Sequence, residues 1–252
     1  MDLEGKVAVV SGASSGIGAA MCKLIEKKGA RVAGLDISEP PSGGVGSSDN
    51  SVFVRCDVTK PDSWASAIAQ VNEHLGDISA LFLNAGVMLR PPNVSTATDA
   101  LELADSDAYH RVFNVNVHGL VNGLKAARES MVRAGDAGVV ATASVAGIGG
   151  LSFDPYYSMT KHAVVGFVRS FAPVLEPLGV RIHAICPGGV QTAIVPDDAK
   201  HLIDNFMTPE TLAENAIALL GLDTTGEIWV KDETDKPRWK VQSAYGTDEG
   251  LD

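Results

Sequence analysis

Short apolar runs alternate with amphipathic stretches along almost the whole chain, and this alternation constrains the fold more than any other feature. The apolar runs are expected as strands at 7–12, 31–36, 51–58, 78–86, 138–144, 180–189 and 227–231. Helical patterns fill most of the gaps, at 17–28, 61–75, 105–133, 156–178 and 208–221. Strands that are apolar at nearly every position are buried on both faces, as in a parallel sheet covered by helices.

The order of these elements predicts one α/β domain over residues 1–252. We expect a Rossmann-type, doubly wound parallel sheet of about seven strands, with helices on both faces. No internal repeat and no domain-sized change of composition divides the chain. The gap at 40–50 is rich in Gly, Ser and Pro and is too short for a full crossover helix, so we expect a loop there.

Three glycines follow the first expected strand. Gly12, Gly16 and Gly18 form the pattern G-x-x-x-G-x-G. Glycine lets the backbone turn sharply and approach a pyrophosphate, whose charge the start of the next helix favours. An ordinary tight turn is the alternative, but the strand and the helix stand on the required sides. We therefore predict a dinucleotide site, which also includes the intervening Ser14, Ser15 and Ile17.

A carboxylate ends the second expected strand. Asp36 can accept hydrogen bonds from the adenosine ribose hydroxyls and repels a 2′-phosphate. The positions where a basic residue could meet that phosphate hold Ser14, Ser15 and Ile37. The sequence therefore favours NAD over NADP, with Asp36 and Ile37 in the cofactor site. A cap at the end of the strand is the alternative role of Asp36.

Two further strand ends complete this end of the predicted cofactor site. Asp57 and Val58 follow the third strand and suit the adenine edge, or else serve the turn into the next helix. Asn84, Ala85 and Gly86 follow the fourth strand. Their backbone would pack against the cofactor or the neighbouring strand, and we expect their role to be mostly structural.

Tyr157 and Lys161 stand four residues apart in YYSMTK. On a helix this spacing places both side chains on one face. An ammonium beside a phenol stabilises the phenolate and lowers a tyrosine pKa from its usual value of about 10. A tyrosine tuned in this way can exchange a proton with an alcohol near neutral pH. Alone, the pair is equally compatible with a half-exposed helix surface.

The charge balance narrows the classes of partner. The chain has 20 Lys and Arg against 31 Asp and Glu, a formal charge of −11. Nucleic acids and anionic membranes both require a basic face, so neither is expected as a partner. No stretch approaches the ~18 uninterrupted apolar residues of a membrane-spanning helix. A small molecule is the expected partner.

The cysteines and the N-terminus indicate the compartment. Cys22, Cys56 and Cys186 are odd in number, widely spaced and without a His or Cys at metal-ligand spacing. We expect reduced, half-buried cysteines, no metal site and a cytoplasmic protein. The first residues, MDLEGKVAVVSG, lack the basic start and apolar core of a signal peptide.

Together these motifs resemble the short-chain dehydrogenase/reductase family over nearly the full length. The matching elements stand in the order of the family: SGASSGIG at 11–18, Asp57, NAG at 84–86, Asn116 in NVNVHG, Ser144, Tyr157-x-x-x-Lys161 and PGGVQT at 187–192. The resemblance implies an oxidoreductase that transfers a hydride between NAD(H) and a secondary alcohol or ketone.

The resemblance also implies a role for each catalytic residue. Tyr157 would be the general acid/base, and Ser144 would hydrogen-bond the developing carbonyl oxygen. Lys161 would lower the pKa of Tyr157 and bind the nicotinamide ribose. Asn116 would hold a water that links Lys161 to solvent. The nicotinamide side of the cofactor site would be lined by Pro187, Gly188, Val190 and Thr192, with Tyr157 and Lys161.

Two departures from the family pattern are informative. Ser11 replaces a more usual threonine, which keeps the hydroxyl. The last strand continues into EIWVKDETDKPRWKVQ, so residues 231–252 form a C-terminal extension. This ending is similar to the branch that contains 15-hydroxyprostaglandin dehydrogenase and insect alcohol dehydrogenases, which uses NAD. The extension is compatible with disorder, a cover over the pocket or exchange with a neighbouring subunit.

Two segments are expected to cover the substrate end, 145–156 and 193–207, the second as a lid. Their side chains predict an apolar pocket for a lipid-, steroid- or aromatic-like alcohol, or else pack the lid onto the domain. The candidate substrate residues are Ser144, Ile148, Leu151, Phe153, Ile194, Val195, Phe206 and Met207. No basic clamp is evident, although Arg90, Arg169 or Arg238 could fold nearer. His162 and His201 are expected as surface or packing residues.

Three alternatives remain open at this point. They are a catalytically idle relative that senses NAD or acts as a scaffold, a methyltransferase, and an NADPH-dependent carbonyl reductase. The complete set of Asn116, Ser144, Tyr157 and Lys161 argues against the first two, and Asp36 argues against the third. The resemblance implies a homodimer or homotetramer, because the helices at 105–133 and 156–178 form the usual dimer face of the family. Their small and apolar side chains could serve as core or as interface: Val115, Val117, Leu120, Leu124, Ala163, Val164, Phe167 and Phe171.

Overall fold

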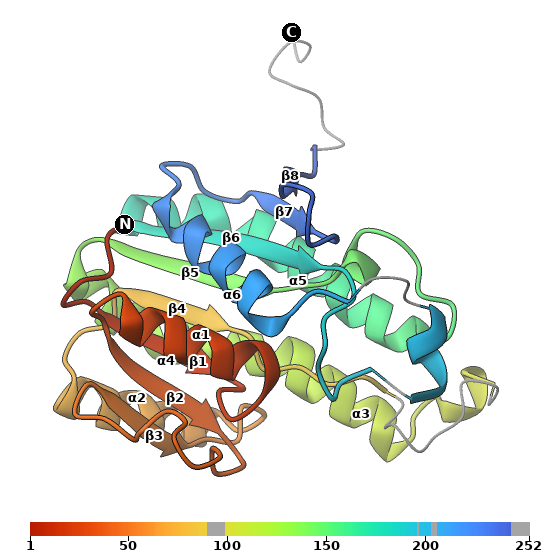
Figure 1. Ribbon diagram of the computed structural model, residues 1–252, viewed down its shortest axis with the longest axis horizontal. Helices are drawn as coiled ribbons and strands as arrows, with labels where there is room; N and C mark the ends of the chain where they lie inside the picture. The colour runs from red at the N-terminus through yellow and green to blue at the C-terminus, as the bar shows by residue number, and fades with distance from the viewer. Residues whose placement is uncertain (90–98, 196, 203–205, 243–252) are drawn as a thin grey trace, which may run out of the picture.

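The computed structural model describes residues 1–89, 99–195, 197–202 and 206–242. In these residues one sheet of eight strands crosses the molecule in the order β3-β2-β1-β4-β5-β6-β7-β8 (Figure 1). Neighbouring strands from β3 to β7 are parallel, and β8 pairs antiparallel with β7. The predicted α/β fold with a doubly wound parallel sheet is confirmed.

The strands agree closely with the apolar runs of the sequence. They are β1 (Val7–Ser11), β2 (Arg31–Asp36), β3 (Ser51–Arg55), β4 (Ala80–Leu83), β5 (Ala137–Thr142), β6 (Val180–Pro187), β7 (Ile228–Lys231) and β8 (Trp239–Lys240). The sequence predicted the run 227–231, which contains β7, as the last strand. That prediction is wrong, because β8 follows it. The two residues of β8 are too few to produce a recognisable pattern of alternation.

The α-helices are α1 (Gly16–Lys27), α2 (Pro61–His74), α3 (Asp107–Phe113), α4 (Gly119–Ala134), α5 (Pro155–Leu175) and α6 (Pro209–Ala218). Short 3₁₀ turns lie at Leu101–Leu103, Val145–Gly147, Glu176–Leu178, Asp197–Leu202 and Leu219–Gly221. Among the described residues, no helix combines the length and the apolar character needed to cross a bilayer.

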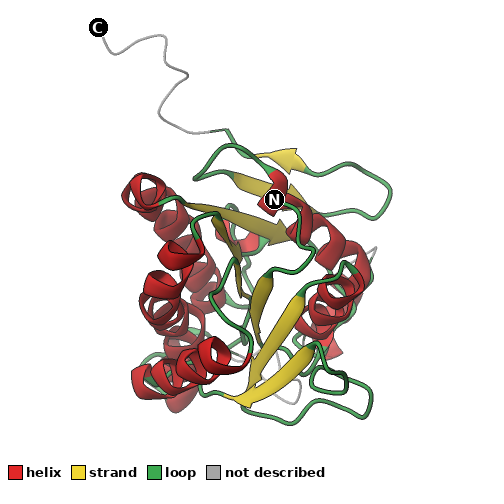
Figure 2. Cartoon of the chain, turned by 90° about the vertical axis from the view of Figure 1, so that its left-hand side faces the viewer, coloured by secondary structure: helices red, strands yellow, loops and turns green. Residues whose placement is uncertain are grey.

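Helices cover both faces of the sheet (Figure 2). On one face α1 and α6 pack over side chains such as Val10 and Phe82. On the other face α2, α4 and α5 bury a second set, which includes Trp64 and Leu81. Because each central strand is buried on both sides, its side chains are apolar at nearly every position, as the sequence pattern requires.

The stretch predicted as one helix over 105–133 is not uniform. A π-helical turn, Asn114–His118, joins α3 to α4. Its i→i+5 pairing closes a turn with five residues in place of about four, so it absorbs one residue without separating the two helices. Asn116 lies in this turn and is buried. The wide turn therefore sits where the family resemblance places a functional side chain.

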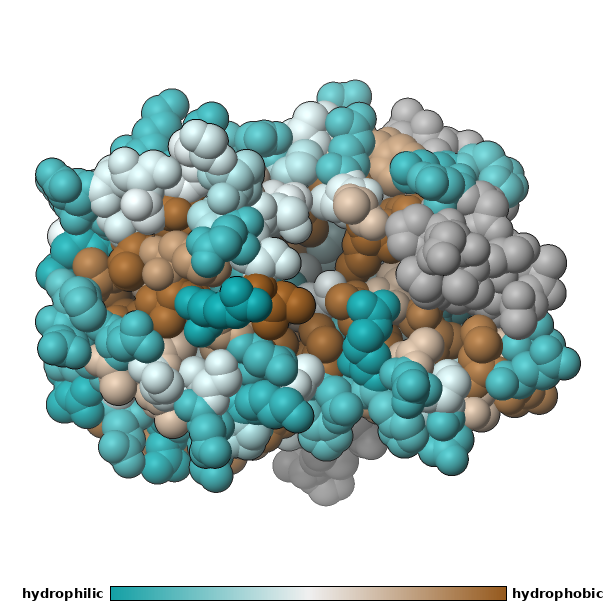
Figure 3. Space-filling view, turned by 90° about the horizontal axis from the view of Figure 1, so that it is seen from below, coloured by the Kyte–Doolittle hydropathy of each residue, from teal (hydrophilic) through white to brown (hydrophobic). Residues whose placement is uncertain are grey.

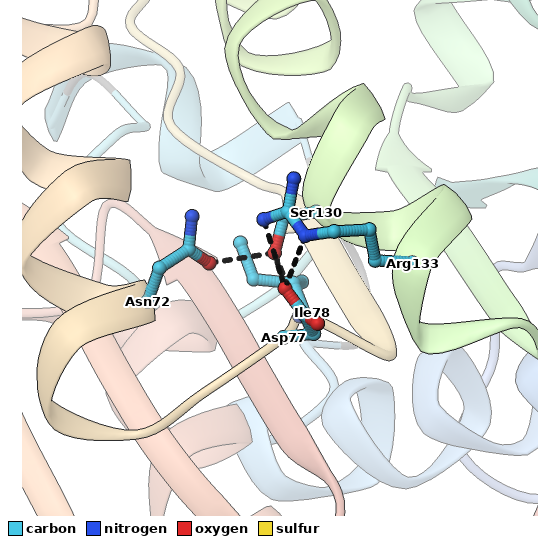
Figure 4. Close-up of polar contacts among 5 residues, drawn as sticks. All are labelled: Asn72, Asp77, Ile78, Ser130 and Arg133. Carbon is cyan, nitrogen blue, oxygen red and sulfur yellow. Dashed lines mark hydrogen bonds and ion pairs between the residues drawn. The ribbon is translucent and has the colours of Figure 1, made fainter.

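A polar cluster fixes the amino ends of the sheet, far along the strands from their carboxyl ends. The backbone N–H of Ile78, just before β4, donates to Ser130 Oγ on α4 at 3.0 Å (Figure 4). Ser130 donates in turn to Asn72 on α2 and to Asp77. Arg133 pairs with Asp77 at 2.8 Å. This cluster holds α2 and α4 together at the edge remote from the motifs.

The described part of the C-terminal extension folds back onto the sheet. Lys231 is buried, and its ammonium donates to the carbonyls of Thr234 and Lys236. The Arg238 guanidinium lies 5.3 Å from the centre of the Trp229 ring. These contacts turn the chain so that β8 covers β7. Residues 243–252 of the extension lie outside the described residues.

Candidate active site

A cavity of about 780 Å³ opens at the carboxyl ends of the strands. Its wall includes residues that follow β1, β2, β3, β4, β5 and β6, together with side chains from α3 and α5. Figure 3 shows the molecule hollowed near the middle of one face, with apolar side chains on the border of the hollow. The volume lies in the upper part of the range of about 300–1,000 Å³ that is typical of ligand sites.

The glycine turn after β1 is shaped by close backbone packing. Gly12 and Gly16 have φ values of +70° and +51°, which side-chain-bearing residues rarely adopt. A Cβ on Gly18 would lie 2.0 Å from the carbonyl oxygen of Gly12. Gly12 and Gly16 line the cavity, whereas Gly18 lies behind it and lets α1 approach the turn. The backbone at the start of α1 is thus open to a bound phosphate, so the turn fits a dinucleotide.

Asp36 lies at the end of β2 and lines the same cavity. Its carboxylate accepts hydrogen bonds from the backbone N–H groups of Ser14 and Ser38, each at 3.0 Å. Asp36 therefore braces the turn after β1 and the chain after β2, while it also lines the cavity. It caps no helix of the described residues, as the alternative role required. Ser14 itself does not line the cavity, while the exposed Ile37 does.

The fourth strand end is held by Ser11. Its hydroxyl oxygen accepts from the backbone N–H groups of Asn84 and Ala85 at 3.0 and 3.1 Å. The Asn84 side chain donates to the carbonyl of Ser11 and accepts from Thr142. The predicted structural role of Asn84 is therefore present, and Asn84 to Gly86 also line the cavity.

Tyr157 and Lys161 lie on the first turns of α5 and both line the cavity. Asp154 caps this helix, since its carboxylate accepts from the backbone N–H of Tyr157 at 3.0 Å. Lys161 Nζ donates to the carbonyl of Thr142 at 2.8 Å and lies 5.5 Å from the centre of the Tyr157 ring. The spacing therefore brings phenol and ammonium to one wall, as predicted.

The electrostatics of this pair correct the expectation from the sequence. Burial raises the pKa of Tyr157 to about 12, and a hydrogen bond with Ser144 offsets only part of that effect. Burial also lowers the pKa of Lys161 to about 8. Desolvation is the largest cause of both shifts, because each charged form loses contact with water. Proximity to an ammonium was therefore not enough to predict the direction of the shift.

Ser144 and Asn116 lie close to the pair in different ways. The Ser144 hydroxyl lines the cavity and accepts from the backbone N–H of Ala146 at 3.1 Å. Asn116 lies behind the main wall, where its amide bonds both backbone groups of Val87 and the hydroxyl of Thr160. A second cavity of about 10 Å³ lies there and is lined by both Asn116 and Lys161.

The segment after β6 forms the opposite wall. The backbone N–H of Gly188 donates to the carbonyl of Lys231 at 3.0 Å, which ties this wall to β7. A Cβ on Gly16 would lie 3.0 Å from Thr192 Cγ2, so the segment after β6 closes over the glycine turn. Pro187, Gly188, Val190 and Thr192 all line the cavity, as predicted.

The substrate end agrees with the sequence only in part. Of the apolar candidates, Leu151, Phe153, Ile194 and Val195 line the cavity. Three others do not. Met207 is fully buried in the core under α6, because its backbone bridges to Val190 and directs it inward. Ile148 packs against the core beneath α4 and α5, and the half-buried Phe206 lies outside the wall.

The remaining cofactor candidates come together at one wall. The residues that line the cavity there are Ser15, Ile17, Asp57 and Val58. Three predicted site residues, Ser14, Gly18 and Asn116, support the wall from behind. The predicted lid 193–207 is described except at 196 and 203–205, and its closing stays a prediction.

Sequence reasoning missed Arg111, which lies on α3 and lines the cavity with Val115. On a uniform α-helix Arg111 would be about 140° around the axis from Asn116. In the structure both nevertheless contact the segment 87–88, since Arg111 donates to the carbonyl of Met88 and Asn116 bonds Val87. Of the arginines considered before, Arg169 and Arg238 do not line the cavity, and Arg90 lies outside the described residues.

The fold and the cavity define the class of the protein, a nucleotide-binding α/β domain with a candidate active site at the carboxyl ends of its strands. The chain belongs to the short-chain dehydrogenase family, because the family model described as short chain dehydrogenase matches residues 6–202. Secoisolariciresinol dehydrogenase of Forsythia intermedia is 36% identical over 196 residues, 76% of this chain and 68% of that protein. Short-chain dehydrogenase reductase 5 of Arabidopsis thaliana is 34% identical and covers 85% of this chain and 83% of its own.

Solved structures show the same fold. The 3-ketoacyl-(acyl-carrier-protein) reductase from Brucella melitensis, complexed with NADH, aligns with a TM-score of 0.79 and 26% identity. That alignment covers 91% of this chain and 97% of the reductase. Thermoplasma acidophilum aldohexose dehydrogenase aligns with a TM-score of 0.75 and 26% identity, over 92% and 94% of the two chains. The family fold serves a nicotinamide cofactor, and the cavity described above fits one.

Proposed function

We propose that the protein is an NAD-dependent dehydrogenase of secondary alcohols, or the corresponding ketone reductase, with Tyr157 as general acid/base. The observation that carries this proposal is the shared wall of Tyr157, Lys161 and Ser144 in a cavity that also reaches the glycine turn and Asp36. Bound there, the nicotinamide would supply or accept the hydride. The chain itself must bind the substrate and move its proton.

The residues divide the proton chemistry between them. In the oxidation the Tyr157 phenolate would take the alcohol proton, and in the reduction the Tyr157 hydroxyl would return it to the substrate oxygen. The Ser144 hydroxyl would donate to that oxygen as carbonyl character develops. A Lys161 pKa of about 8 lets this ammonium exchange its proton near neutral pH. The small cavity beside Asn116 has room for about one water, which supports the predicted relay from Lys161 toward solvent.

Asp36 supports NAD as the cofactor. Its carboxylate is held in place by two backbone N–H groups and faces the cavity at the end of β2. A 2′-phosphate at that position would meet a fixed negative charge, whereas a free ribose hydroxyl could donate to it. No Lys or Arg among the described residues lines this end of the cavity.

The side chains at the other end support an apolar substrate body. Leu151, Phe153, Ile194 and Val195 come from two segments that lie on either side of the cavity. Met88 adds an apolar surface from the loop after β4. A lipid-, steroid- or aromatic-like alcohol would bury apolar area against these residues.

The test is Tyr157→Phe, with Tyr156→Phe as the matched control. Tyr156 is the adjacent tyrosine, and its ring packs on Tyr109. We expect Tyr157→Phe to lower kcat by about 10²–10⁴-fold on the best alcohol of a panel, while NADH binding is retained. Tyr156→Phe should keep most of the activity. Full activity in Tyr157→Phe would refute the assignment.

The panel itself separates the alternatives. Wild-type protein is tested with NAD and NADP on steroids, hydroxy acids, aryl carbinols, cyclic alcohols and sugars. Turnover with NADP alone would favour the carbonyl reductase. NADH binding without any turnover would favour the sensing or scaffold role.

We also propose a homo-oligomer that uses α4 and α5. These helices leave Val121, Met159 and Val174 exposed. Leu120, Leu124 and Val164, which the sequence offered as core or interface, are buried in the core of the chain itself. Sedimentation of wild type and Met159→Glu would test this face, because a charge there should shift an oligomer toward monomer.

A further inference from the structure

Arg111 is a cation at the outer part of a mainly apolar cavity. It lies on α3, which extends beyond the carboxyl ends of the strands (Figure 1). The described residues that line the cavity include two cationic side chains, Lys161 and Arg111. Lys161 is buried against the carbonyl of Thr142. Arg111 is therefore the cation of the described wall that remains available to a ligand.

The guanidinium is anchored but not neutralised. Arg111 Nη2 donates to the carbonyl of Met88 at 3.3 Å, and among the described residues it forms no ion pair. One neutral acceptor occupies one of the five N–H donors of the side chain. The planar fork that remains matches the two oxygens of a carboxylate.

The surroundings of Arg111 are connected to those of Tyr157 by described contacts. Met88 and Tyr157 belong to one buried cluster, which also contains Val112, the residue after Arg111. Leu89 is tied to the helix of Tyr157 through Asp154 at 2.9 Å. Tyr109 on α3 packs against Tyr156 on α5. Met88 and Leu89 thus connect Arg111 on α3 to the first turn of α5, which carries Tyr157.

We propose that Arg111 is a specificity-determining residue that binds a carboxylate at the far end of the substrate. The inference rests on the proposed function and deepens it. The substrate class becomes a hydroxy acid, with a secondary alcohol at Tyr157, an apolar body along Met88 and a carboxylate at Arg111. A molecule of net charge −11 repels anions at long range, so a local cation in the site is needed to select one.

The experiment compares a chain-length series of (ω−1)-hydroxyalkanoates with their methyl esters, which lack the terminal charge and carry one extra methyl group. The variants are Arg111→Gln and Arg111→Lys. Arg128→Gln is the matched control, because Arg128 is exposed on α4 and does not line the cavity. The readout is kcat/KM with NAD for each acid and ester, together with the Kd of NADH.

At the best chain length, we expect wild type to prefer the acid over its ester by about 10- to 100-fold, the value of a charge-assisted hydrogen bond. Arg111→Gln should reduce kcat/KM for the acid to the value for the ester. The kcat/KM for the ester and the Kd of NADH should stay unchanged. Arg111→Lys should keep part of the preference, and Arg128→Gln all of it. An equal loss for acid and ester, or no preference at any length, would overturn the proposal.

Failure of the proposed reaction can be told apart from failure of the subsite. If neither acid nor ester is oxidised, the matching keto acids are titrated into the enzyme–NADH complex and followed by NADH fluorescence. Binding that Arg111→Gln weakens by about tenfold or more upholds the subsite without the reaction. Binding that Arg111→Gln leaves unchanged, or no binding at any length, overturns the subsite.

Discussion

The two ends of the cavity are built by different means. At the cofactor end, strand ends and tight turns are locked by hydrogen bonds to the backbone, as Ser11 locks Asn84 and Asp36 locks Ser14. At the substrate end, the wall consists of side chains such as Leu151 and Ile194, on loops and a short 3₁₀ turn. Backbone geometry restricts residue identity severely, whereas an apolar wall accepts many side chains of similar volume.

This contrast predicts how each end should respond to change. Substitutions at the cofactor end should be costly and affect folding and NADH binding together. Substitutions at the substrate end should alter selectivity first. The following variants test this division, from the largest effect to the smallest.

Gly18→Ala should have the largest effect. Its Cβ would lie 2.0 Å from the Gly12 carbonyl, and a backbone atom cannot move away as a side chain can. We expect a loss of roughly 3 kcal/mol or more in unfolding free energy, beyond ordinary overpacking, and NADH binding should be lost with it. Denaturant unfolding and NADH titration measure both.

The matched variant at the substrate end is Gly150→Ala. Gly150 lines the cavity, and an added Cβ there meets nothing within 4 Å. Stability and NADH binding should stay near wild type. A comparable loss in both glycine variants would break the proposed division.

Asp154→Ala should have the next largest effect, because the buried Asp154 ties residue 89 after β4 to the start of α5 and is an exception at the substrate end. Its buried carboxylate accepts from the backbone of Tyr157 and of Leu89. Loss of the cap and of a buried acceptor should cost about 2–4 kcal/mol in urea unfolding. Ser106→Ala removes the cap of α3, which is less buried, and should cost about 1 kcal/mol. Equal costs would show that Asp154 is an ordinary cap.

Asp36→Ala should change cofactor choice by about tenfold in favour of NADP, if the carboxylate repels the 2′-phosphate. The variant also removes the acceptor for Ser14 and Ser38. Asp36→Asn loses the charge but keeps one acceptor oxygen, so it can retain one of the two backbone hydrogen bonds that Asp36→Ala removes. Selectivity is measured as the ratio of kcat/KM for NAD and NADP. An unchanged ratio in Asp36→Asn would show that the charge of Asp36 is not the cause of the cofactor preference.

His183 should produce the smallest effect, seen as a pH dependence of stability. It is buried in β6, and burial lowers its pKa below the usual 6.5, against the opposing influence of Glu227. The unfolded chain then binds the proton more tightly, so stability should fall as the pH drops below about 6.5. His183→Asn should flatten that part of the profile from urea unfolding. An unaltered profile would assign the acid sensitivity to other groups.

Much of the fold and of the cofactor end could be predicted from the sequence for a physical reason. Strands that are buried on both faces must be apolar, and the turn at Gly18 tolerates no side chain. Both constraints therefore produce residue patterns that can be recognised in the sequence. The substrate end produces fewer recognisable residue patterns. Met207 has the same character as a pocket residue, yet its backbone bridge to Val190 directs it into the core.

Arg111 and the pKa of Tyr157 could not be predicted for other reasons. The position of Arg111 depends on how α3 packs beside the cavity, which no residue pattern in the sequence indicates. The pKa of Tyr157 depends on how much water reaches it, a property of the whole wall. The similarity to the prostaglandin dehydrogenase branch stays a prediction.

The pairing of β8 with β7 also governs how the sheet can grow beyond one molecule. A long unpaired strand is a template on which further chains can add, and filaments form by repetition of that step. Here the β7 edge is covered by a strand of two residues, one of them a lysine. Short, charged strands are poor templates for addition. The addition of further chains at this edge is therefore blocked by β8, the strand that the sequence pattern did not predict.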